Sequence, residues 1–284
     1  MKEYYKNKNG VLYLGDCKEV ISQMVNDSSF EKVNLVFTSP PYAERRIKSY
    51  GGIPEENYTS WFLPIGALIK SILKDDGSFF LNIKPHTNKG ERSLYVFELV
   101  LALKKEIGFL FVDEFCWKKN PFPGMLKGRF KNSFEPIYHF SKISPNNIIF
   151  NPLACGTSIK EESIARSYRK QCGPPKNGSG MTGMNTTNIR NLKLARPSNL
   201  VDINNVSNQF SNKKKHPATF PEGLSDFFVK SFSNERDIVL DPFGGSGTVA
   251  LSAERLNRRW ILIEKEEKYC DLIVERLIEK KIER

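Results

Sequence analysis

The sequence lacks the features that would place it among membrane or disulfide-rich proteins. No run reaches the about 18 consecutive apolar residues that a membrane-spanning helix needs. The lysine-rich residues 1–10 contain no apolar core of a secretory signal, and the chain shows no internal repeat. The five cysteines are odd in number and form no C-x-x-C pair, which argues against a disulfide framework or a zinc site. We therefore expect a protein of the reducing cytoplasm without a metal site.

The positive charge of the chain is concentrated in one segment. The 284 residues carry a net charge of +11, which favours a polyanionic partner. Residues 118–215 contain 17 Lys and Arg but only four Asp and Glu, so this segment carries +13 and the remainder −2. A solvated basic face would give the same count. The mixture of basic residues with Gly, Asn, Ser and aromatic residues favours a surface that follows a nucleic-acid backbone.

Strands and helices alternate in the first half of the chain and again after residue 217. Period-two and helical patterns predict strands at 11–14, 33–37, 78–83, 238–240 and 260–263, paired edge strands at 109–117 and 136–140, and helices near 20–25, 61–73, 94–103, 224–232 and 248–256 and at the C-terminus. Short strands joined by helices of this length indicate an α/β protein with a mainly parallel sheet covered on both faces.

Regular patterns fade between residues 144 and 215, where Asn, Gly, Ser and Lys dominate. This stretch is too long for a simple loop. We interpret residues 144–212 as an inserted recognition region, and residues 1–143 with 213–284 as one catalytic and cofactor-binding domain.

A glycine-rich turn follows the predicted strand 238–240. In residues 241–248 (DPFGGSGT), Gly245 and Gly247 allow a close approach between backbone and ligand where the strand meets the next helix. Glu264 lies 19 residues after Gly245, at the end of the following strand. A carboxylate there can bind the ribose of an adenine nucleoside, in NAD or in S-adenosylmethionine. A plain tight turn is the alternative interpretation.

Two residues of this turn favour S-adenosylmethionine over NAD. Asp241 places an acid near an ammonium-bearing ligand, and Phe243 offers an aromatic face to a purine. A pyrophosphate prefers glycine immediately at the strand end, and no hydride-transfer site is apparent.

The segment 38–42 (TSPPY) ends the predicted strand 33–37 and is the sharper signal. Its two prolines fix the backbone and leave the preceding carbonyls without local N–H partners. Free acceptors of this kind can activate the exocyclic amine of a nucleic-acid base, which is otherwise a poor nucleophile. If the Ser39 side chain and the Pro40 carbonyl accept the two amine hydrogens, the nitrogen can attack a methyl sulfonium. The same acceptors then stabilise the positive charge that develops on the nitrogen. Tyr42 offers a face for an extruded base. A structural turn or a helix cap at Thr38 and Ser39 are the alternatives.

With both loops in view, the chain resembles the amino-methylating DNA methyltransferases of bacterial restriction–modification systems, in their beta permutation. Residues 39–42 look like the family's D/N/S-P-P-Y/F/W motif, and residues 241–248 look like its cofactor motif about 200 positions later. Three further segments are similar to family segments with known roles. Residues 14–16 (LGD) resemble the segment that contacts the cofactor adenine, and residues 117–123 (WKKNPFP) resemble the one that helps to hold the flipped base. Residues 216–221 (HPATFP) resemble the segment beside the cofactor's methionine moiety.

The resemblance implies a Rossmann-like, circularly permuted methyltransferase fold with a mainly parallel seven-stranded sheet and an antiparallel edge. It implies S-adenosyl-L-methionine as cofactor and duplex DNA as substrate. The implied catalytic residues are Ser39, Pro40 and Tyr42, and the implied cofactor-binding residues are Asp16, Thr38, Asp241, Phe243, Gly245, Gly247, Thr248 and Glu264. A separately encoded restriction endonuclease is the implied partner, and the choice between monomer and homodimer stays open.

The resemblance also bears on the target base. Serine at the first motif position, preceded by threonine, is commonest among cytosine-N4 enzymes, whereas aspartate is more typical of adenine-N6 enzymes. Cytosine N4 is therefore expected, with adenine N6 as the alternative. An RNA or protein methyltransferase could use similar loops, but the long basic insertion has the size of a duplex-recognition module. An NAD-dependent oxidoreductase leaves residues 39–42 unexplained, and an inactive DNA-binding module would need a damaged motif, whereas both motifs are intact.

The DNA contacts are expected around the catalytic loop. Residues 43–58 are predicted to form a mobile flap that touches phosphates near the extruded base. The expected DNA-binding residues are Arg45, Arg46, Lys48, Asn120, Phe122, Arg129 and Lys131.

Overall fold

The computed structural model describes residues 1–43, 52–88, 90–120, 128, 130–159, 194–203 and 220–282. By its contacts the chain forms two units, residues 1–151 with 199–284 and residues 152–198. In the smaller unit, β9 (Thr157–Ser158) pairs with β10 (Leu194–Ala195) antiparallel. The assignment of residues 144–212 to DNA recognition stays a prediction. No helix in the described ranges is long and apolar enough to cross a membrane.

The larger unit is built on a sheet in the order β1-β2-β13-β12-β3-β4-β8-β7-β11. Neighbouring strands from β2 through β4 are parallel, and β8 runs antiparallel to both of its neighbours. The strands are β1 (Glu3–Lys6), β2 (Gly10–Leu14), β3 (Val33–Thr38), β4 (Leu73–Asn82), β7 (Leu110–Lys118), β8 (Phe134–Ser141), β11 (Leu200–Val201), β12 (Ile238–Asp241) and β13 (Arg259–Glu264). The short strands β5 (Thr87–Asn88) and β6 (Glu91–Arg92) form a separate hairpin.

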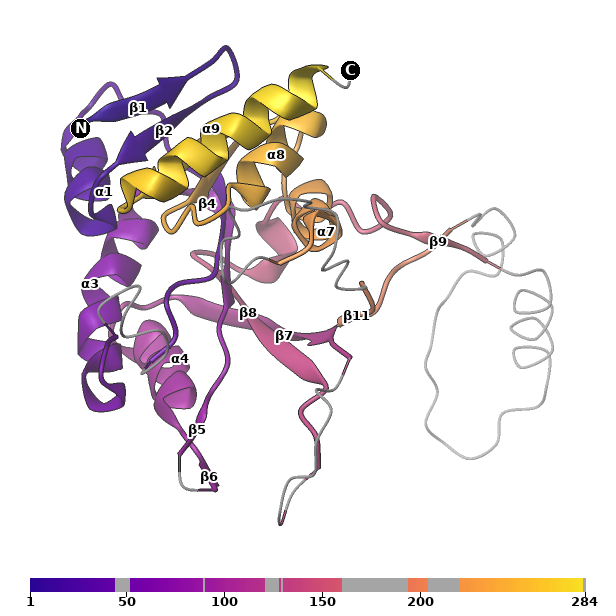
Figure 1. Ribbon diagram of the computed structural model, residues 1–284. Helices are drawn as coiled ribbons and strands as arrows, with labels where there is room; N and C mark the ends of the chain where they lie inside the picture. The colour runs from indigo at the N-terminus through magenta and orange to yellow at the C-terminus, as the bar shows by residue number, and fades with distance from the viewer. Residues whose placement is uncertain are drawn as a thin grey trace. The chain divides into compact units, whose positions relative to one another are not determined.

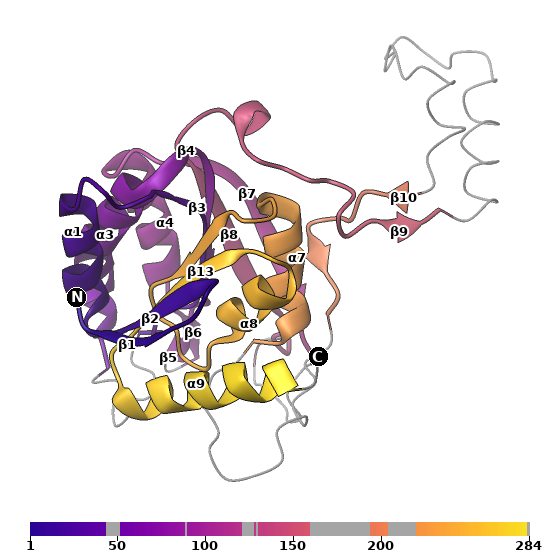
Figure 2. The same ribbon diagram turned by 90° about the horizontal axis from the view of Figure 1, so that it is seen from above.

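Helices cover both faces of this sheet, as the alternating pattern predicts (Figures 1 and 2). One layer contains α1 (Cys17–Asn26), α3 (Glu55–Ile72) and α4 (Tyr95–Lys105), and the other contains α7 (Glu222–Phe232), α8 (Thr248–Arg255) and α9 (Glu267–Ile282). In β3 the side chain of Val36 belongs to the core under the first layer, and those of Leu35 and Phe37 belong to the core under the second. This alternation explains why every residue of β3 is buried.

The Rossmann-like α/β fold is confirmed, with differences in detail. The seven expected strands form the centre of the sheet, and β1 and β11 extend it to nine. Both additions are short edge strands with little apolar alternation, which is why the sequence pattern did not indicate them. β4 begins at Leu73 rather than at residue 78 as predicted, and its register with β3 shifts between Val33 and Leu35.

One helix begins earlier than its apolar pattern predicts. α3 starts at Glu55 rather than near residue 61, with Pro54 at its N-cap and two acids in its first turn. Residues 55–58 are therefore helical and not part of a mobile flap, and Tyr58 is fully buried. Proline before a pair of acids is a helix-start signal that explains this boundary.

Candidate active site

The predicted cofactor residues converge where the parallel strands of the sheet end. β2, β13, β12 and β3 are successive parallel neighbours, so their carboxyl ends meet at the same edge. Glu264, Asp241 and Thr38 are the last residues of their strands, and Asp16 is the second residue after β2. Open α/β sheets bind ligands at this edge. The fold thus brings together acids that lie up to 248 residues apart in the sequence.

A buried hydrogen bond joins the two predicted loops. The Thr38 hydroxyl donates to Asp241 Oδ1 at 2.6 Å, and both residues are almost inaccessible to solvent. The same carboxylate oxygen accepts the Phe243 N–H at 3.0 Å. Burial raises the pKa of Asp241 to about 7, and the nearby charge of Glu264 adds to this rise while the two hydrogen bonds oppose it. The end of the catalytic strand is therefore fixed to the start of the cofactor loop.

The glycines of the cofactor loop are required by its conformation. Gly245 and Gly247 have positive φ angles of 55° and 78°, a region that other residues rarely adopt. A Cβ on Gly247 would lie 3.0 Å from the side chain of Ile273 in α9. Gly247 also forms the N-cap of α8. The glycine pair therefore allows the chain to turn from β12 into α8 beneath α9.

Most backbone N–H groups of this loop already bond to protein acceptors. Phe243 N–H bonds to Asp241, Gly244 N–H to the Ile263 carbonyl at 2.8 Å, Gly245 N–H to Glu264, and Gly247 N–H to the Gly244 carbonyl at 2.8 Å. A pyrophosphate-binding turn would direct such groups at the ligand. The loop therefore fits a cofactor without phosphate better than it fits NAD.

Glu264 supports the loop in addition to its predicted role toward a ribose. One carboxylate oxygen accepts the Gly245 N–H at 2.7 Å and the other accepts the Glu266 N–H at 2.9 Å. Burial raises the pKa of its carboxyl. A carboxylate offers about four lone-pair sites, so these two bonds leave capacity for hydroxyl donors.

Thr248 belongs to a polar cluster under the loop. Its hydroxyl lies 3.1 Å from Ser246 Oγ. Arg276, on α9, donates to the Ser246 carbonyl and pairs with Glu222 at 3.3 Å. The guanidinium is buried, which lowers its pKa. Neither Arg276 nor Glu222 was predicted from the sequence, because charged residues in amphipathic helices usually face solvent.

The catalytic loop is braced from α3. Ser39 is half-buried, and its hydroxyl lies 3.4 Å from the Tyr42 hydroxyl. The buried Tyr58 donates to the Pro41 carbonyl at 2.6 Å. This bond occupies the carbonyl of the second proline, which directly follows the Pro40 carbonyl expected to bind the base amine. Tyr58 is a further site residue that the sequence did not indicate, since the helix was expected to begin after it.

An aromatic wall stands beside the cofactor loop. The half-buried ring of Phe243 lies 5.9 Å from Trp61 and 6.5 Å from Phe62, both on α3. These rings fix the orientation of Phe243 at the strand ends. Asp16, by contrast, accepts the Lys18 N–H at 2.9 Å as the N-cap of α1.

Only part of the predicted DNA-binding set can be placed. Asn120 and Lys131 are exposed near the ends of β7 and β8 that border the candidate site. Other members of the set lie outside the described residues: Arg45, Arg46, Lys48, Phe122 and Arg129. His216 and its neighbours through residue 219 also lie outside. Among the described residues, no group of three or more His, Cys, Asp or Glu side chains could hold a metal ion.

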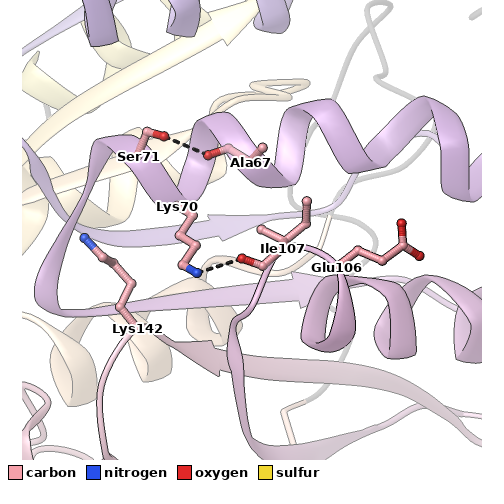
Figure 3. A pocket seen from close by; sticks show the side chains of 6 residues that line it. All are labelled: Ala67, Lys70, Ser71, Glu106, Ile107 and Lys142. Atoms are coloured by element: carbon pink, nitrogen blue, oxygen red, sulfur yellow. Dashed lines mark hydrogen bonds between the residues drawn. The ribbon is translucent and has the colours of Figure 1, made fainter.

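A pocket of about 400 Å³ is lined by side chains that Figure 3 shows from close by. The side chains around it come from the ends of α3 and α4 and from the segment after β8. The Lys70 ammonium donates to the carbonyls of Ile107 and Gly108 at 2.6 and 2.9 Å, and Lys142 pairs with Asp75 at 2.6 Å. These lysines complete the end of α4 and the start of β4, so the cavity is separate from the candidate active site.

The comparisons of this chain with known proteins agree on one family. The family model N6_N4_Mtase, described as DNA methylase, matches residues 33–275. The chain is 32% identical to the Type II methyltransferase M.PvuII of Proteus hauseri over 94% of its own length and 83% of that protein. It is 31% identical to the orphan methyltransferase M.BamHII of Bacillus amyloliquefaciens, over 86% of its length and 88% of the relative.

Solved structures share the fold. A structure described as PvuII DNA methyltransferase (cytosine-N4-specific) matches with a TM-score of 0.69 and 28% identity, covering 97% of this chain and 88% of that one. A structure described as a complex of M1.HpyAVI with SAM matches with a TM-score of 0.59 and 22% identity, covering 94% of this chain and 98% of that one.

Proposed function

This chain belongs to the DNA methylase family of N6- and N4-methyltransferases, and from that premise we propose that it methylates the N4 amine of cytosine in duplex DNA. S-adenosyl-L-methionine is the methyl donor, and the target base leaves the helix to reach the donor. DNA methyltransferase activity follows from the family, and the choice of cytosine N4 is the finer part of the proposal.

The observation that carries the proposal is the buried hydrogen bond from Thr38 to Asp241. It fixes the loop expected to bind the base amine directly beside the loop expected to bind the cofactor. Methyl transfer needs the acceptor nitrogen and the donor carbon in line and in contact, which requires two rigidly connected loops. A structural turn at residues 39–42 would not need this connection.

The residues present fit the cofactor. The internally bonded N–H groups of the glycine loop suit a ligand without phosphate. Asp241 is buried without a cationic partner in its hydrogen bonds and has a raised pKa, so a ligand ammonium nearby would stabilise its charge. Phe243 and Glu264 would hold the adenine and the ribose, and Asp16 lies at the end of the neighbouring strand. When bound, the cofactor supplies a methyl group on a sulfonium.

The chain's own groups activate the acceptor. Ser39 Oγ and the Pro40 carbonyl accept the two amine hydrogens, which makes the nitrogen lone pair available for attack. The same acceptors stabilise the positive charge that develops on nitrogen. Tyr42 stacks on the extruded base, and the bond from Tyr58 to the Pro41 carbonyl keeps the loop in place.

Cytosine is favoured over adenine on two grounds. Serine rather than aspartate stands at the first position of the catalytic motif, preceded by Thr38. A relative that is similar over nearly the whole chain is described as cytosine-N4-specific. Methylation of adenine N6 is the second candidate, because the chemistry of the two amines is nearly the same.

The biological partners follow from the same proposal. Relatives described as Type II methyltransferases support a role in protecting DNA from a separately encoded restriction endonuclease. Residues 144–212 would then read the DNA sequence, as their basic composition suggests.

Transfer of a labelled methyl group tests the proposal. Duplex DNA should accept the label, whereas RNA and protein should not. Ser39→Ala should abolish transfer while cofactor binding persists, and Gly245→Asp should abolish cofactor binding. Ser71→Ala, an exposed serine on α3, is the matched control and should retain full activity. Undiminished transfer by Ser39→Ala would refute the role given to the catalytic loop.

A further inference from the structure

Three charged side chains meet near the catalytic loop, and none of them is among the site residues named from the sequence, although one lies within the segment 117–123. Lys84 follows the end of β4, Lys119 directly follows β7, and Glu135 lies at the start of β8. β4 and β7 both run antiparallel to β8. The three residues therefore lie at the same end of the strands as the candidate active site.

One carboxylate oxygen holds both ammonium groups. Glu135 Oε1 lies 2.9 Å from Lys119 Nζ and also contacts Lys84 Nζ. The glutamate side chain is 6% exposed, whereas the side chains of Lys119 and Lys84 are 23% and 32% exposed. The cluster carries one buried negative charge and two positive charges that solvent reaches.

The position of Lys119 is fixed further by its neighbours. Its ammonium lies 4.1 Å from the ring centroid of Trp117, and its backbone N–H bonds to the Ser133 carbonyl at 2.7 Å. Burial lowers the pKa of Lys119, and the charge of Lys84 adds to this, while Glu135 opposes both. The side chain is therefore held in place although it has lost part of its hydration.

The cluster flanks the catalytic loop. Thr38 pairs with Leu81 in the register of β3 and β4, so Lys84 continues from β4 alongside the segment 39–42. Tyr95 donates to the Lys84 carbonyl at 2.9 Å, and its ring lies 4.7 Å from that of Tyr58, which braces the catalytic loop.

A purely structural ion pair would need one cation for the buried Glu135. The second lysine adds repulsion between two ammonium groups that share a single oxygen atom. An anion that reaches both lysines from solvent would offset that repulsion by its attraction to each ammonium group. The substrate of the proposed reaction carries such an anion at every nucleotide.

We propose that Lys84 and Lys119 bind one backbone phosphate of the target DNA strand, next to the extruded base, and that Glu135 holds both ammonium groups in position for it. This assignment rests on the proposed function. The site contributes affinity and register without reading sequence, as phosphate contacts do.

Salt dependence of DNA binding tests the site. Binding of a fluorescent duplex substrate is measured by anisotropy over a series of NaCl concentrations, with a non-reactive cofactor analogue present. Lys84→Met and Lys119→Met should each weaken binding, and each should reduce the slope of log K against log salt by up to about 1. Each variant keeps one lysine on Glu135, so the buried charge stays paired. Lys104→Met, exposed on α4 at the opposite edge, is the matched control and should leave the slope unchanged.

Neutral phosphates give the second arm. A methylphosphonate is placed at one position of the target strand at a time. One position near the target base should weaken binding of the wild-type protein several-fold and have little effect on Lys119→Met. Unchanged salt slopes in both lysine variants, with lower thermal stability only, would overturn the site and leave a structural ion cluster. If the wild-type protein transfers no methyl group to DNA, the proposed function itself fails, which is a separate result.

Discussion

The hydrogen bond from Tyr58 to the Pro41 carbonyl predicts a selective loss of catalysis. Tyr58→Phe removes only this hydroxyl, which lies 2.6 Å from the carbonyl of the catalytic loop. The ring remains and can keep its contacts with Tyr95 and Trp61. The released carbonyl lies directly after the Pro40 carbonyl, which is the acceptor proposed for the base amine. We expect the loop to lose its alignment while the binding surfaces persist.

The magnitude follows from the bond that is lost. Because Pro41 is only partly buried, its unpaired carbonyl should cost about 1 kcal/mol of folding stability, the low end for a buried group, and lower Tm by about 2–4 °C in a domain of this size. A displacement of about 1 Å at a reacting group costs about 100-fold in rate. We therefore expect kcat to fall about 10- to 100-fold. KM values for DNA and for the cofactor should change little.

Tyr95→Phe is the matched control. It removes a hydroxyl that donates to the Lys84 carbonyl at 2.9 Å, from a ring in contact with Tyr58, but it does not touch the catalytic loop. Both variants should lose similar stability in thermal unfolding, and only Tyr58→Phe should lose kcat in single-turnover methyl transfer. Equal kcat values for the two variants would show that the hydroxyl of Tyr58 has no positioning role.

Three further predictions concern the cofactor loop. The pKa of Asp241 is raised from 3.8 to about 7, so its contribution to stability is present below about pH 4 and is lost as the pH rises through 7. In urea unfolding of the cofactor-free protein, Asp241→Asn should remove this fall in stability between about pH 4 and 7. An identical pH profile for the variant and the wild-type protein would contradict the assignment. Gly247→Ala places a Cβ 3.0 Å from Ile273 at a positive φ, which strains the cofactor loop. Calorimetry should therefore show cofactor affinity reduced about tenfold, the equivalent of about 1.4 kcal/mol. Unchanged affinity would argue against strain in the loop. Arg276→Lys should weaken cofactor binding, because the guanidinium reaches the loop carbonyl and the acid from two separate nitrogens and a lysine lacks this rigid fork. Arg255→Lys is the control, since its guanidinium bonds to acids of α7, and it should bind the cofactor normally. Equal losses in the two variants would indicate a general effect on packing.

The central fold was predictable because its signals are local. Buried strands such as β3 and β12 appear as short apolar runs, and the glycine turn after β12 marks where a helix must begin. The resemblance to the methyltransferase family placed Thr38, Asp241 and Glu264 in one site, and the parallel order of β3, β12 and β13 explains why their strand ends meet. Edge strands escaped prediction, since β1 and β11 are short and only partly buried.

The supporting residues of the site could not be predicted, because their partners are distant in sequence. Tyr58 lies 17 residues from the carbonyl that it holds, Arg276 lies 30 residues from its loop carbonyl, and Glu135 lies 51 residues from Lys84. No local pattern distinguishes these side chains from ordinary core or surface residues. Their roles depend on the register of strands and the packing of helices, which only the folded structure gives.

The most direct test of the proposed reaction is the identity of the methylated base. Duplex DNA incubated with the protein and a cofactor carrying an isotope-labelled methyl group is digested to nucleosides and analysed by mass spectrometry. We expect labelled N4-methylcytosine, absent when Ser39→Ala replaces the wild-type protein. Labelled N6-methyladenine would contradict the choice of cytosine, and DNA without any labelled base would contradict the proposed reaction itself.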